Sequence, residues 1–473
     1  MVKAMLSPAC GFVLCMAAKW SGPMTTGRLA GGLFAALVVA GVAAALAIAW
    51  RPRIAEVDPP SPQSLDQALA KRGRDLVAIG NCSTCHTRRG GRDFAGDLPV
   101  PTPFGTIYSS NITPDAETGI GRWSEAAFRR AMRSGVDREG RHLYPTFPYD
   151  HFTHVSDDDD RALYAYLMTR QPVHAQAREN QLPFPLDWRV TIAGWKLLFL
   201  RRAALESDPT RSIEWNRGAY LVEGLAHCGA CHTPRNVLGA ERASARFAGG
   251  EADNWSAYAI NAQSPAPVPW DADALFAYLR NGWHPDHGVA RGPMAQVVSN
   301  LADVPDPDVR AIATYMAGVF GPPPPDRKRR GEEVLAQLKS TSAPGRTAGA
   351  TIYAAACATC HETARPLPYG GVNLALSTAL SAPDARNAAN IVLAGIRPVE
   401  GERSPIMPGF AASMSDAQIT ALLDYLRARF SNQPAWTAVE KAVAESRRTQ
   451  TVFLQTSPPP DNAPADASQR AKP

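Results

Sequence analysis

The chain has 473 residues, of which 45% are hydrophobic and 20% are charged, and it carries a formal net charge of +5 at pH 7. This is the composition of an ordinary globular protein, and the length predicts roughly three domains. The Lys and Arg residues form no long stripe with interleaved aromatic side chains, and no Gly-x-Gly-x-x-Gly follows a predicted strand. The sequence therefore argues against nucleic-acid binding and against a dinucleotide-binding domain.

An apolar segment near the N-terminus, residues 29–50, contains no charged side chain. In a helix this segment would be long enough to cross the hydrocarbon core of a bilayer. We therefore expect a retained transmembrane anchor after an N-terminal extension, residues 1–28, in which Met24 is an alternative start. The alternative to an anchor is a signal peptide that is cleaved near residues 47–49, Ala-Ile-Ala.

Six of the eight cysteines fall into three Cys-x-x-Cys-His motifs. The motif residues are Cys82, Cys85 and His86; Cys228, Cys231 and His232; and Cys357, Cys360 and His361. Two thiols at this spacing can each form a thioether to one porphyrin edge, and the following His then reaches the iron as an axial ligand. A zinc site would need a second Cys-x-x-Cys partner at zinc-finger spacing, and none is present. The sequence therefore predicts three covalently bound haem c groups.

Each motif lies within a repeat of one helical pattern. A helical segment that contains a glycine opens each repeat, and a helix with a capping signal and an Ala-x-x-x-Tyr pattern closes it. The residues are Gly73, Ser156, Ala162 and Tyr166; Gly218, Asp306, Ala311 and Tyr315; and Gly349, Ser415, Ala421 and Tyr425. A spacing of four places Ala and Tyr on one helix face. We therefore expect the Tyr to pack on the opening helix, where the glycine permits close approach.

The four aspartates at residues 157–160 follow Ser156 directly. Acidic side chains in a first turn suit the helix dipole, so we interpret this run as a helix start and not as a metal site.

Proline-rich and charged stretches separate the repeats. The predicted organisation is a linker at 51–66, repeats at 67–205, 206–320 and 341–432, a linker at 321–340, and a partly disordered tail at 433–473.

Internal alignment of the repeats locates the second axial ligand. A short helix in each repeat is expected to end at a glycine, and we count twelve residues onward from it. The glycines are Gly135, Gly282 and Gly395, and the aligned residues are Phe147, Met294 and Met407. Because a Met thioether is a known axial ligand of haem iron, we predict that Met294 and Met407 are ligands, the alternative being that they only fill gaps in the core.

Phe147 cannot bind iron, so the first haem needs another ligand or has none. Met132 and Met168 are interpreted as packing residues. His151 and His154 follow the Phe147 position closely, and either imidazole could reach an iron. We take His151 as the first choice and His154 as the reserve, the alternative being that both are solvated loop residues.

Several stretches resemble one family, the tri-haem cytochrome subunits of bacterial membrane-bound dehydrogenases. They are Thr-Pro-Phe-Gly-Thr-Ile-Tyr-Ser-Ser-Asn-Ile-Thr-Pro-Asp at 102–115, Thr-Gly-Ile-Gly-Arg-Trp at 118–123, Leu-Pro-Phe-Pro at 182–185 with Trp195 and Phe199, and Cys-His-Thr-Pro-Arg-Asn at 231–236. Such subunits serve alcohol, gluconate and sorbitol dehydrogenases, and also molybdenum hydroxylases that oxidise aldehydes or N-heteroaromatic compounds such as nicotinate and isoquinoline.

Two departures from the family pattern matter. Phe147 stands where alcohol-dehydrogenase-type relatives have Met, and the run Phe-Pro-Tyr-x-His-Phe-Thr that it begins is more similar to the branch associated with molybdenum hydroxylases. Residues 259–263, Ala-Ile-Asn-Ala-Gln, replace a Pro-Asn-Leu/Ile-Thr stretch of the relatives.

The resemblance implies an all-α fold of three tandem class I cytochrome c domains after an N-terminal transmembrane helix. It also implies an anchored electron-transfer subunit on the periplasmic side of the bacterial cytoplasmic membrane. Such a subunit takes electrons from a catalytic dehydrogenase subunit, here one of the molybdenum-hydroxylase type, and passes them to quinone or a terminal oxidase. The sequence has no pterin, flavin or quinone-cofactor domain, so no substrate chemistry of its own is expected.

Two alternatives stay open. One is the cytochrome subunit of an alcohol- or gluconate-type dehydrogenase. The other is a haem peroxidase or haem-based sensor that acts at the first haem, because only that haem lacks a predicted Met ligand.

Overall fold

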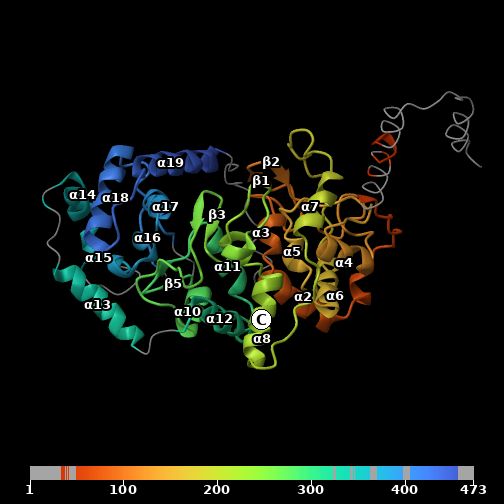
Figure 1. Ribbon diagram of the computed structural model, residues 1–473, viewed down its shortest axis with the longest axis horizontal. Helices are drawn as coiled ribbons and strands as arrows, with labels where there is room; N and C mark the ends of the chain where they lie inside the picture. Colours follow the sequence, from red (N-terminus) through yellow and green to blue (C-terminus); the bar gives the residue numbers. More distant parts are fainter. Residues whose placement is uncertain are drawn as a thin grey trace, which may run out of the picture. The chain divides into compact units, whose positions relative to one another are not determined.

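The computed structural model describes residues 34–37, 39, 41, 49–322, 326–340, 345, 347–362, 370–397 and 405–455. The chain divides into two compact units, residues 1–51 and residues 52–473. The second unit contains the three Cys-x-x-Cys-His motifs, and many of its elements are labelled in Figure 1.

The first repeat contains helices, short helical turns and one hairpin. They are η1 (Pro62–Ser64), α2 (Gln67–Ile79), α3 (Cys82–His86), β1 (Pro99–Thr102), β2 (Gly105–Tyr108), α4 (Glu125–Ser134), α5 (Tyr149–Phe152), α6 (Asp157–Met168) and α7 (Thr191–Phe199). The first motif forms α3 itself, directly after the opening helix α2.

The second repeat has the same order of elements with a further hairpin. It contains α8 (Ile213–Tyr220), the π-helical turn η2 (Leu221–Leu225), α9 (Gly229–His232), η3 (Ala243–Ala245), β3 (Gly250–Ala252), β4 (Trp255–Ala257), α10 (Ala272–Asn281), β5 (Trp283–His284), β6 (Gly288–Val289), α11 (Pro293–Leu301) and α12 (Asp306–Phe320).

In the described part of the rest of the chain, the regular elements are all helices or short helical turns. It contains α13 (Arg327–Ser340), α14 (Ala348–Ala356), α15 (Ala358–His361), η4 (Leu374–Leu376), α16 (Thr378–Ser381), α17 (Arg386–Ala394), α18 (Asp416–Phe430) and α19 (Val439–Gln455). Helix α13 thus lies in the segment expected to be a linker, and α19 lies in the segment expected to be a partly disordered tail.

The closing helices begin where their capping residues predict. The Ser156 side chain accepts a hydrogen bond from Asp159 N at the start of α6, and Ser415 forms a reciprocal capping box with Gln418 at the start of α18. The four aspartates form the first turn of α6, as expected. In α12 the helix begins at Asp306 itself, and the residue before it, Pro305, is the N-cap.

The opening and closing helices of each repeat cross at the predicted glycine. A Cβ atom added to Gly73 would lie 1.9 Å from Ala162 O and 2.8 Å from Tyr166 Cβ. The corresponding distance to the alanine carbonyl is 2.0 Å at Gly218 and 2.1 Å at Gly349. The predicted packing of the Ala-x-x-x-Tyr face on the glycine is therefore confirmed in all three pairs, α2 with α6, α8 with α12 and α14 with α18.

The expectation of an all-α fold is wrong, because three two-stranded antiparallel sheets are present: β1 with β2, β3 with β4, and β5 with β6. The β3–β4 hairpin turns at Asp253 and Asn254, whose φ angles are 48° and 62°. Two left-handed residues at a two-residue turn match the twist of paired strands, and Asp and Asn tolerate that conformation. Strands this short leave little hydrophobic periodicity by which they could be recognised.

The expected transmembrane helix at residues 29–50 is also wrong. A helix needs about 20 consecutive apolar residues to span a bilayer, and in the part of the chain that the structure describes no helix reaches that length and apolarity. Within 29–50 the described helical residues are 34–37, 39, 41 and 49. The others, with residues 1–28, lie outside the described part.

The hydrophobic residues form two separate cores. One core joins the first two repeats, and it contains Leu76 and Leu163 from the first and Leu221 and Ile312 from the second. The other core fills the third repeat around Leu423. The first and second repeats are therefore expected to depend on each other for stability more than either depends on the third.

Candidate functional site

The three Cys-x-x-Cys-His motifs occupy short helical turns. All six motif cysteines are free thiols in the structure. Burial raises the pKa of Cys82 and of Cys228 to about 12. A histidine follows each pair of thiols directly and lies in the same helical turn, and this donor set fits thioether attachment of a haem.

Each motif histidine is oriented by one backbone carbonyl. The Nδ1 atoms of His86, His232 and His361 lie 2.7, 2.7 and 3.0 Å from the carbonyl oxygens of Ser110, Tyr258 and Val372. An Nδ1–H that donates to a carbonyl leaves the lone pair on Nε2, which is the arrangement of a metal-binding histidine. Burial lowers the pKa of all three rings, so each is neutral, as an iron ligand must be.

Two glycines lie in close contact with the second and third motifs. A Cβ atom on Gly371 would lie 2.5 Å from His361 Nδ1, and one on Gly250 would lie 2.3 Å from Cys231 O. A side chain at either place would displace the motif backbone or the histidine ring. Close approach of these glycines thus fixes the His361 ring and the backbone of the second motif.

The helices expected to precede the sixth-ligand positions end where predicted. Gly135 and Gly282 are left-handed C-caps of α4 and α10, and Gly395 caps α17. Met294 lies in the first turn of α11 and packs partly against the first core. Met407 pairs with Ile396 through two backbone hydrogen bonds of 2.8 and 3.0 Å and packs partly against the second core. Their assignment as iron ligands stays a prediction.

The aligned residue of the first repeat lies in an aromatic cluster. Phe147 contacts Phe152 with 5.2 Å between ring centroids and Tyr149 with 6.5 Å. Tyr149 in turn packs against Trp195 of α7 at 6.1 Å. Apolar rings therefore surround the position where the other two repeats present a Met.

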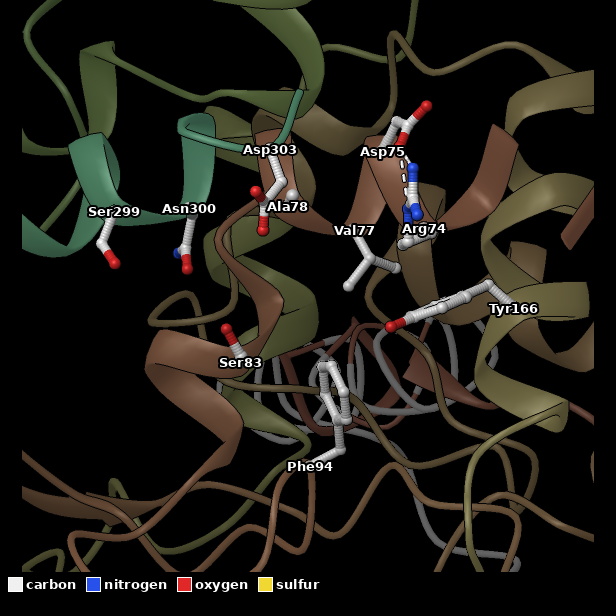
Figure 2. A pocket seen from close by; sticks show the side chains of 10 residues that line it. All are labelled: Arg74, Asp75, Val77, Ala78, Ser83, Phe94, Tyr166, Ser299, Asn300 and Asp303. Atoms are coloured by element: carbon white, nitrogen blue, oxygen red, sulfur yellow. Dashed lines mark hydrogen bonds and ion pairs between the residues drawn. The ribbon is translucent and has the colours of Figure 1, made fainter. Parts of the chain in front are cut away.

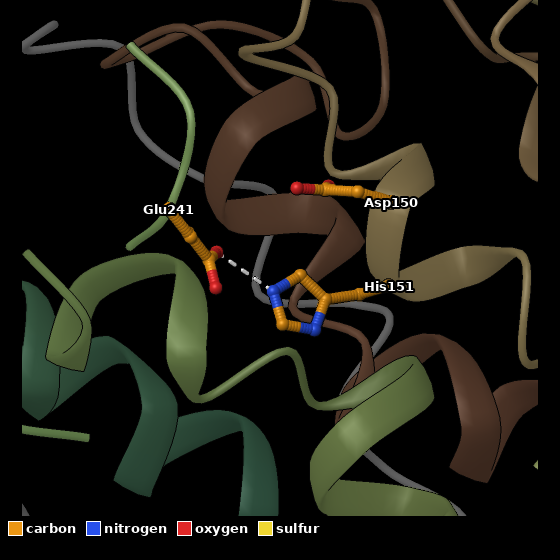
Figure 3. A group of neighbouring side chains, drawn as sticks. All are labelled: Asp150, His151 and Glu241. Carbon is orange, nitrogen blue, oxygen red and sulfur yellow. Dashed lines mark hydrogen bonds and ion pairs between the residues drawn. The ribbon is translucent and has the colours of Figure 1, made fainter. Parts of the chain in front are cut away.

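His151 joins the first repeat to the second (Figure 3). Its Nδ1 lies 2.8 Å from Glu223 O in η2, and its Nε2 lies 2.8 Å from Glu241 Oε1. A Cβ atom on Gly229 of the second motif would lie 3.0 Å from the His151 ring. Both ring nitrogens are thus engaged. To bind an iron through Nε2, His151 would have to leave Glu241, whereas Nδ1 could keep its backbone carbonyl. Its assignment as an axial ligand stays a prediction.

His151 has the electrostatic setting of a buried ion pair. Burial of the ring lowers its pKa, but the hydrogen bond and the charge of Glu241 outweigh that effect and raise the pKa of His151 overall. Burial raises the pKa of Glu241, and His151 outweighs it in turn, so the pKa of Glu241 is lowered. Because both ring nitrogens face oxygen acceptors, the imidazolium form satisfies both of them.

The same cluster has a donor set that could hold a metal ion. Asp150, His151 and Glu241 each offer one ligand atom, and these atoms lie within 4.8 Å of one another. An imidazolium at His151 accounts for the same geometry without an ion, and Arg235 lies 3.9 Å from Glu241. We therefore interpret the cluster as an ion pair between repeats.

The reserve residue, His154, has a ring arrangement closer to that of the motif histidines. Its Nδ1 lies 2.6 Å from Ala203 O. When Nδ1–H donates to that carbonyl, Nε2 carries the lone pair. Burial lowers the pKa of His154, which favours the neutral ring.

A second link between the first two repeats has no signature in the sequence. Asn300, in the helix α11 that carries Met294, donates hydrogen bonds of 2.9 Å to Asn81 Oδ1 and to Thr84 Oγ1 beside and within the first motif. A half-open cleft of about 560 Å³ lies next to these contacts and is lined by Ser83 and Asn300 among others (Figure 2). The helix that carries Met294 thus touches the first Cys-x-x-Cys-His segment.

The comparisons with known proteins agree with this arrangement. The Cytochrome c family model matches residues 70–171 and 347–429. These ranges contain the first and the third Cys-x-x-Cys-His motifs with their opening and closing helices.

Three relatives that are named as dehydrogenase subunits are similar to this chain over most of its length. A subunit of the nicotinate dehydrogenase of Pseudomonas putida is 45% identical over 89% of this chain, which spans only 35% of that protein. The fructose dehydrogenase cytochrome subunit of Gluconobacter japonicus is 34% identical, over 80% of this chain and 82% of its own length. The gluconate 2-dehydrogenase cytochrome c subunit of Pantoea cypripedii is 36% identical, over 82% and 91%.

Proposed function

The chain belongs to the family of cytochrome c subunits of bacterial dehydrogenases, and we propose that it carries three covalently bound haem c groups for electron transfer. The observation that carries the number three is the recurrence of one local geometry. Each motif histidine has its Nδ1 atom at a backbone carbonyl, so each repeat presents an imidazole prepared for iron. When bound, haem c supplies one-electron chemistry at its iron.

The protein contributes attachment, ligation and shielding from water. In this proposal the paired cysteines of each motif hold the porphyrin edge, and the motif histidines bind the iron. Met294 and Met407 would also be iron ligands, in the second and third repeats. A thioether ligand raises the haem potential, so these two haems are the higher-potential pair.

The proposed electron donor is a separate catalytic dehydrogenase of the molybdenum-hydroxylase type. The 45% identity to the nicotinate dehydrogenase subunit supports this branch. The run Phe-Pro-Tyr-x-His-Phe-Thr at residues 147–153 supports it as well. The proposed acceptor is quinone or a terminal oxidase, and the proposed compartment is the periplasm, where c-type haems are attached to bacterial proteins.

A haem count tests the proposal directly. Thioether bonds are covalent, so three haem masses are expected to stay with the chain after denaturation and removal of free haem. Mass spectrometry of the intact denatured protein measures this. A chain that retains fewer than three haems contradicts the proposed haem number.

One observation favours a second activity at the first haem. Phe147 stands at its sixth-ligand position, and both nitrogens of His151 are engaged elsewhere. A first haem without a strong sixth ligand could bind a small molecule such as carbon monoxide, as in a sensor or peroxidase. A reduced-state spectrum with and without carbon monoxide decides this, because six-coordinate haems resist the ligand.

A further inference from the structure

The second and third repeats meet at the loops that carry their methionines. Arg291 lies three residues before Met294, and its guanidinium Nη2 donates a hydrogen bond of 3.1 Å to Gly395 O in the third repeat. Gly395 caps α17 with φ 70°, and a Cβ atom there would lie 2.4 Å from Met407 O. The next residue, Ile396, holds Met407 through two backbone hydrogen bonds. The guanidinium thus binds the segment that fixes the other methionine.

A second contact joins the same two repeats on the histidine side of the second motif. Asn387 in α17 accepts a hydrogen bond of 2.9 Å from Ser256 N and donates one of 2.8 Å to Ser256 O. Ser256 lies in β4, two residues before Tyr258, and Tyr258 O orients His232. The third repeat therefore contacts the segments behind both proposed axial ligands of the second haem.

Arg291 brings a charge to this junction. Burial lowers the pKa of Arg291, and nearby Arg397 lowers it further. A guanidinium nevertheless stays protonated in proteins. Arg291 is partly buried, and a partly buried charge acts over a longer range than an exposed one.

We propose that Arg291 is a positioning residue shared by the second and third haems. It holds the Met294 loop against the Met407 loop, and its charge favours the reduced, less positive state of both irons. The inference rests on the proposed ligation by Met294 and Met407. It predicts that the two haem potentials are set jointly.

The test is a redox titration of the purified full chain with its haems attached, followed by visible absorbance. We expect Arg291→Gln to shift both Met-ligated potentials downward together, and Arg291→Lys to retain most of the potential because it retains the charge. Arg242→Gln is the matched control, since it removes one exposed positive charge from the same repeat and should leave both potentials unchanged.

Specific outcomes overturn the proposal. It fails if Arg291→Gln shifts only one potential, or shifts both no more than Arg242→Gln does. Circular dichroism and haem content show whether each variant is folded, and if the Gln variant does not fold, a Lys variant with both potentials strongly lowered is sufficient to reject the charge effect. A failure of the proposed function looks different, because Met294→Ala and Met407→Ala would then leave the haem spectra unaltered.

Discussion

Each motif histidine depends on a single carbonyl that is distant in sequence from it. Ser110 and Tyr258 lie 24 and 26 residues after their histidines, whereas Val372 lies only 11 residues after His361. The motif residues could be predicted from the sequence, because thioether chemistry fixes their spacing. Their carbonyl partners could not, because a backbone acceptor has no residue identity, and the loops that deliver it differ in length between repeats.

The sixth ligand of the first haem is the residue for which the sequence offers the least support. Phe147 is recognisable as the aligned position, since a benzyl side chain cannot ligate iron. The choice of His151 rests on its closeness in sequence, which takes no account of Glu241 and Glu223, two partners in the next repeat. A loop histidine carries no periodic signal that reveals such partners.

The first prediction concerns the spectrum of the first haem. If His151 keeps the contacts that it has in the structure, His151→Ala leaves the spin state of that haem unchanged. Magnetic circular dichroism measures the spin state, and carbon monoxide binding reports an open coordination position. A change to high-spin iron that binds carbon monoxide would establish His151 as the ligand after all. His154→Ala is the companion variant, because the His154 ring has Nδ1 at a carbonyl.

The second prediction is the pH dependence of the His151–Glu241 pair. Because the pKa of His151 is raised in the folded protein, the ring contributes to the free energy of unfolding. This contribution is complete below the pKa of the unfolded chain, about 6.5, and is lost as pH rises through the folded pKa. The lowered pKa of Glu241 gives a contribution that is present above about 4.3 and is lost as pH falls. The pair therefore stabilises the fold most between about pH 4.3 and about pH 6.5.

A matched variant isolates that pair. We expect His151→Gln to lower the free energy of unfolding at pH 6 by about 1–3 kcal/mol, the range for a hydrogen bond to a charged group. At pH 9 the difference from the natural chain should shrink. Guanidinium denaturation at both pH values measures it, and an equal difference at the two values contradicts the ion pair.

At the scale of elements, helix ends and helix crossings were predictable and the hairpins were not. Ser156 and Ser415 cap their helices because a hydroxyl accepts from a first-turn N–H, which is a local rule. The glycine crossings repeat three times, so the pattern is visible in the chain itself. The β5–β6 hairpin has two residues per strand, and pairs so short are set by tertiary contacts.

The third prediction tests one helix crossing. In Gly218→Ala the new Cβ would lie 2.0 Å from Ala311 O, so α8 and α12 must move apart. Overpacking of this kind costs about 1–3 kcal/mol. Gly194→Ala is the control, because that glycine lies in α7 and the added Cβ would meet nothing within 4 Å beyond its own chain neighbours and helix backbone. Alanine also favours a helix by about 0.5–1 kcal/mol. Thermal unfolding should separate the two variants, and equal midpoints would contradict the crossing.

At the scale of the whole molecule, the recurrence of one unit was predictable and the way in which the units share their cores was not. Each repeat shows its motif and its crossing glycine in the sequence. The shared core depends on which faces the repeats turn toward each other, as at Gly80 of the first repeat, where an added Cβ atom would lie 3.1 Å from Leu225 Cδ1 of the second. Apolar residues in a helix show that a face is buried but do not identify the partner that buries it.

The last prediction follows from the two separate cores. Replacing Cys357 and Cys360 by Ser should remove one haem and leave the spectra and unfolding midpoint of the first two repeats nearly unchanged. Among the described residues, Val268 is the one buried member of the core around Leu423 that comes from those two repeats. Replacing Cys228 and Cys231 should also remove one haem. That loss should lower the unfolding midpoint of the first repeat as well, since both repeats pack into one cluster.

Mass spectrometry measures the haem number of each variant. Guanidinium unfolding, followed at the haem absorbance, measures its unfolding midpoint. The comparison is informative because both variants lose the same number of thioethers and the same cofactor, so a difference between them reports the packing of the repeats. If the two variants destabilise the first repeat equally, coupling through the shared core is not what links it to the second. If the third-repeat variant is the more harmful, the contacts of Arg291 and Ser256 with the third repeat stabilise the molecule more than the shared core does.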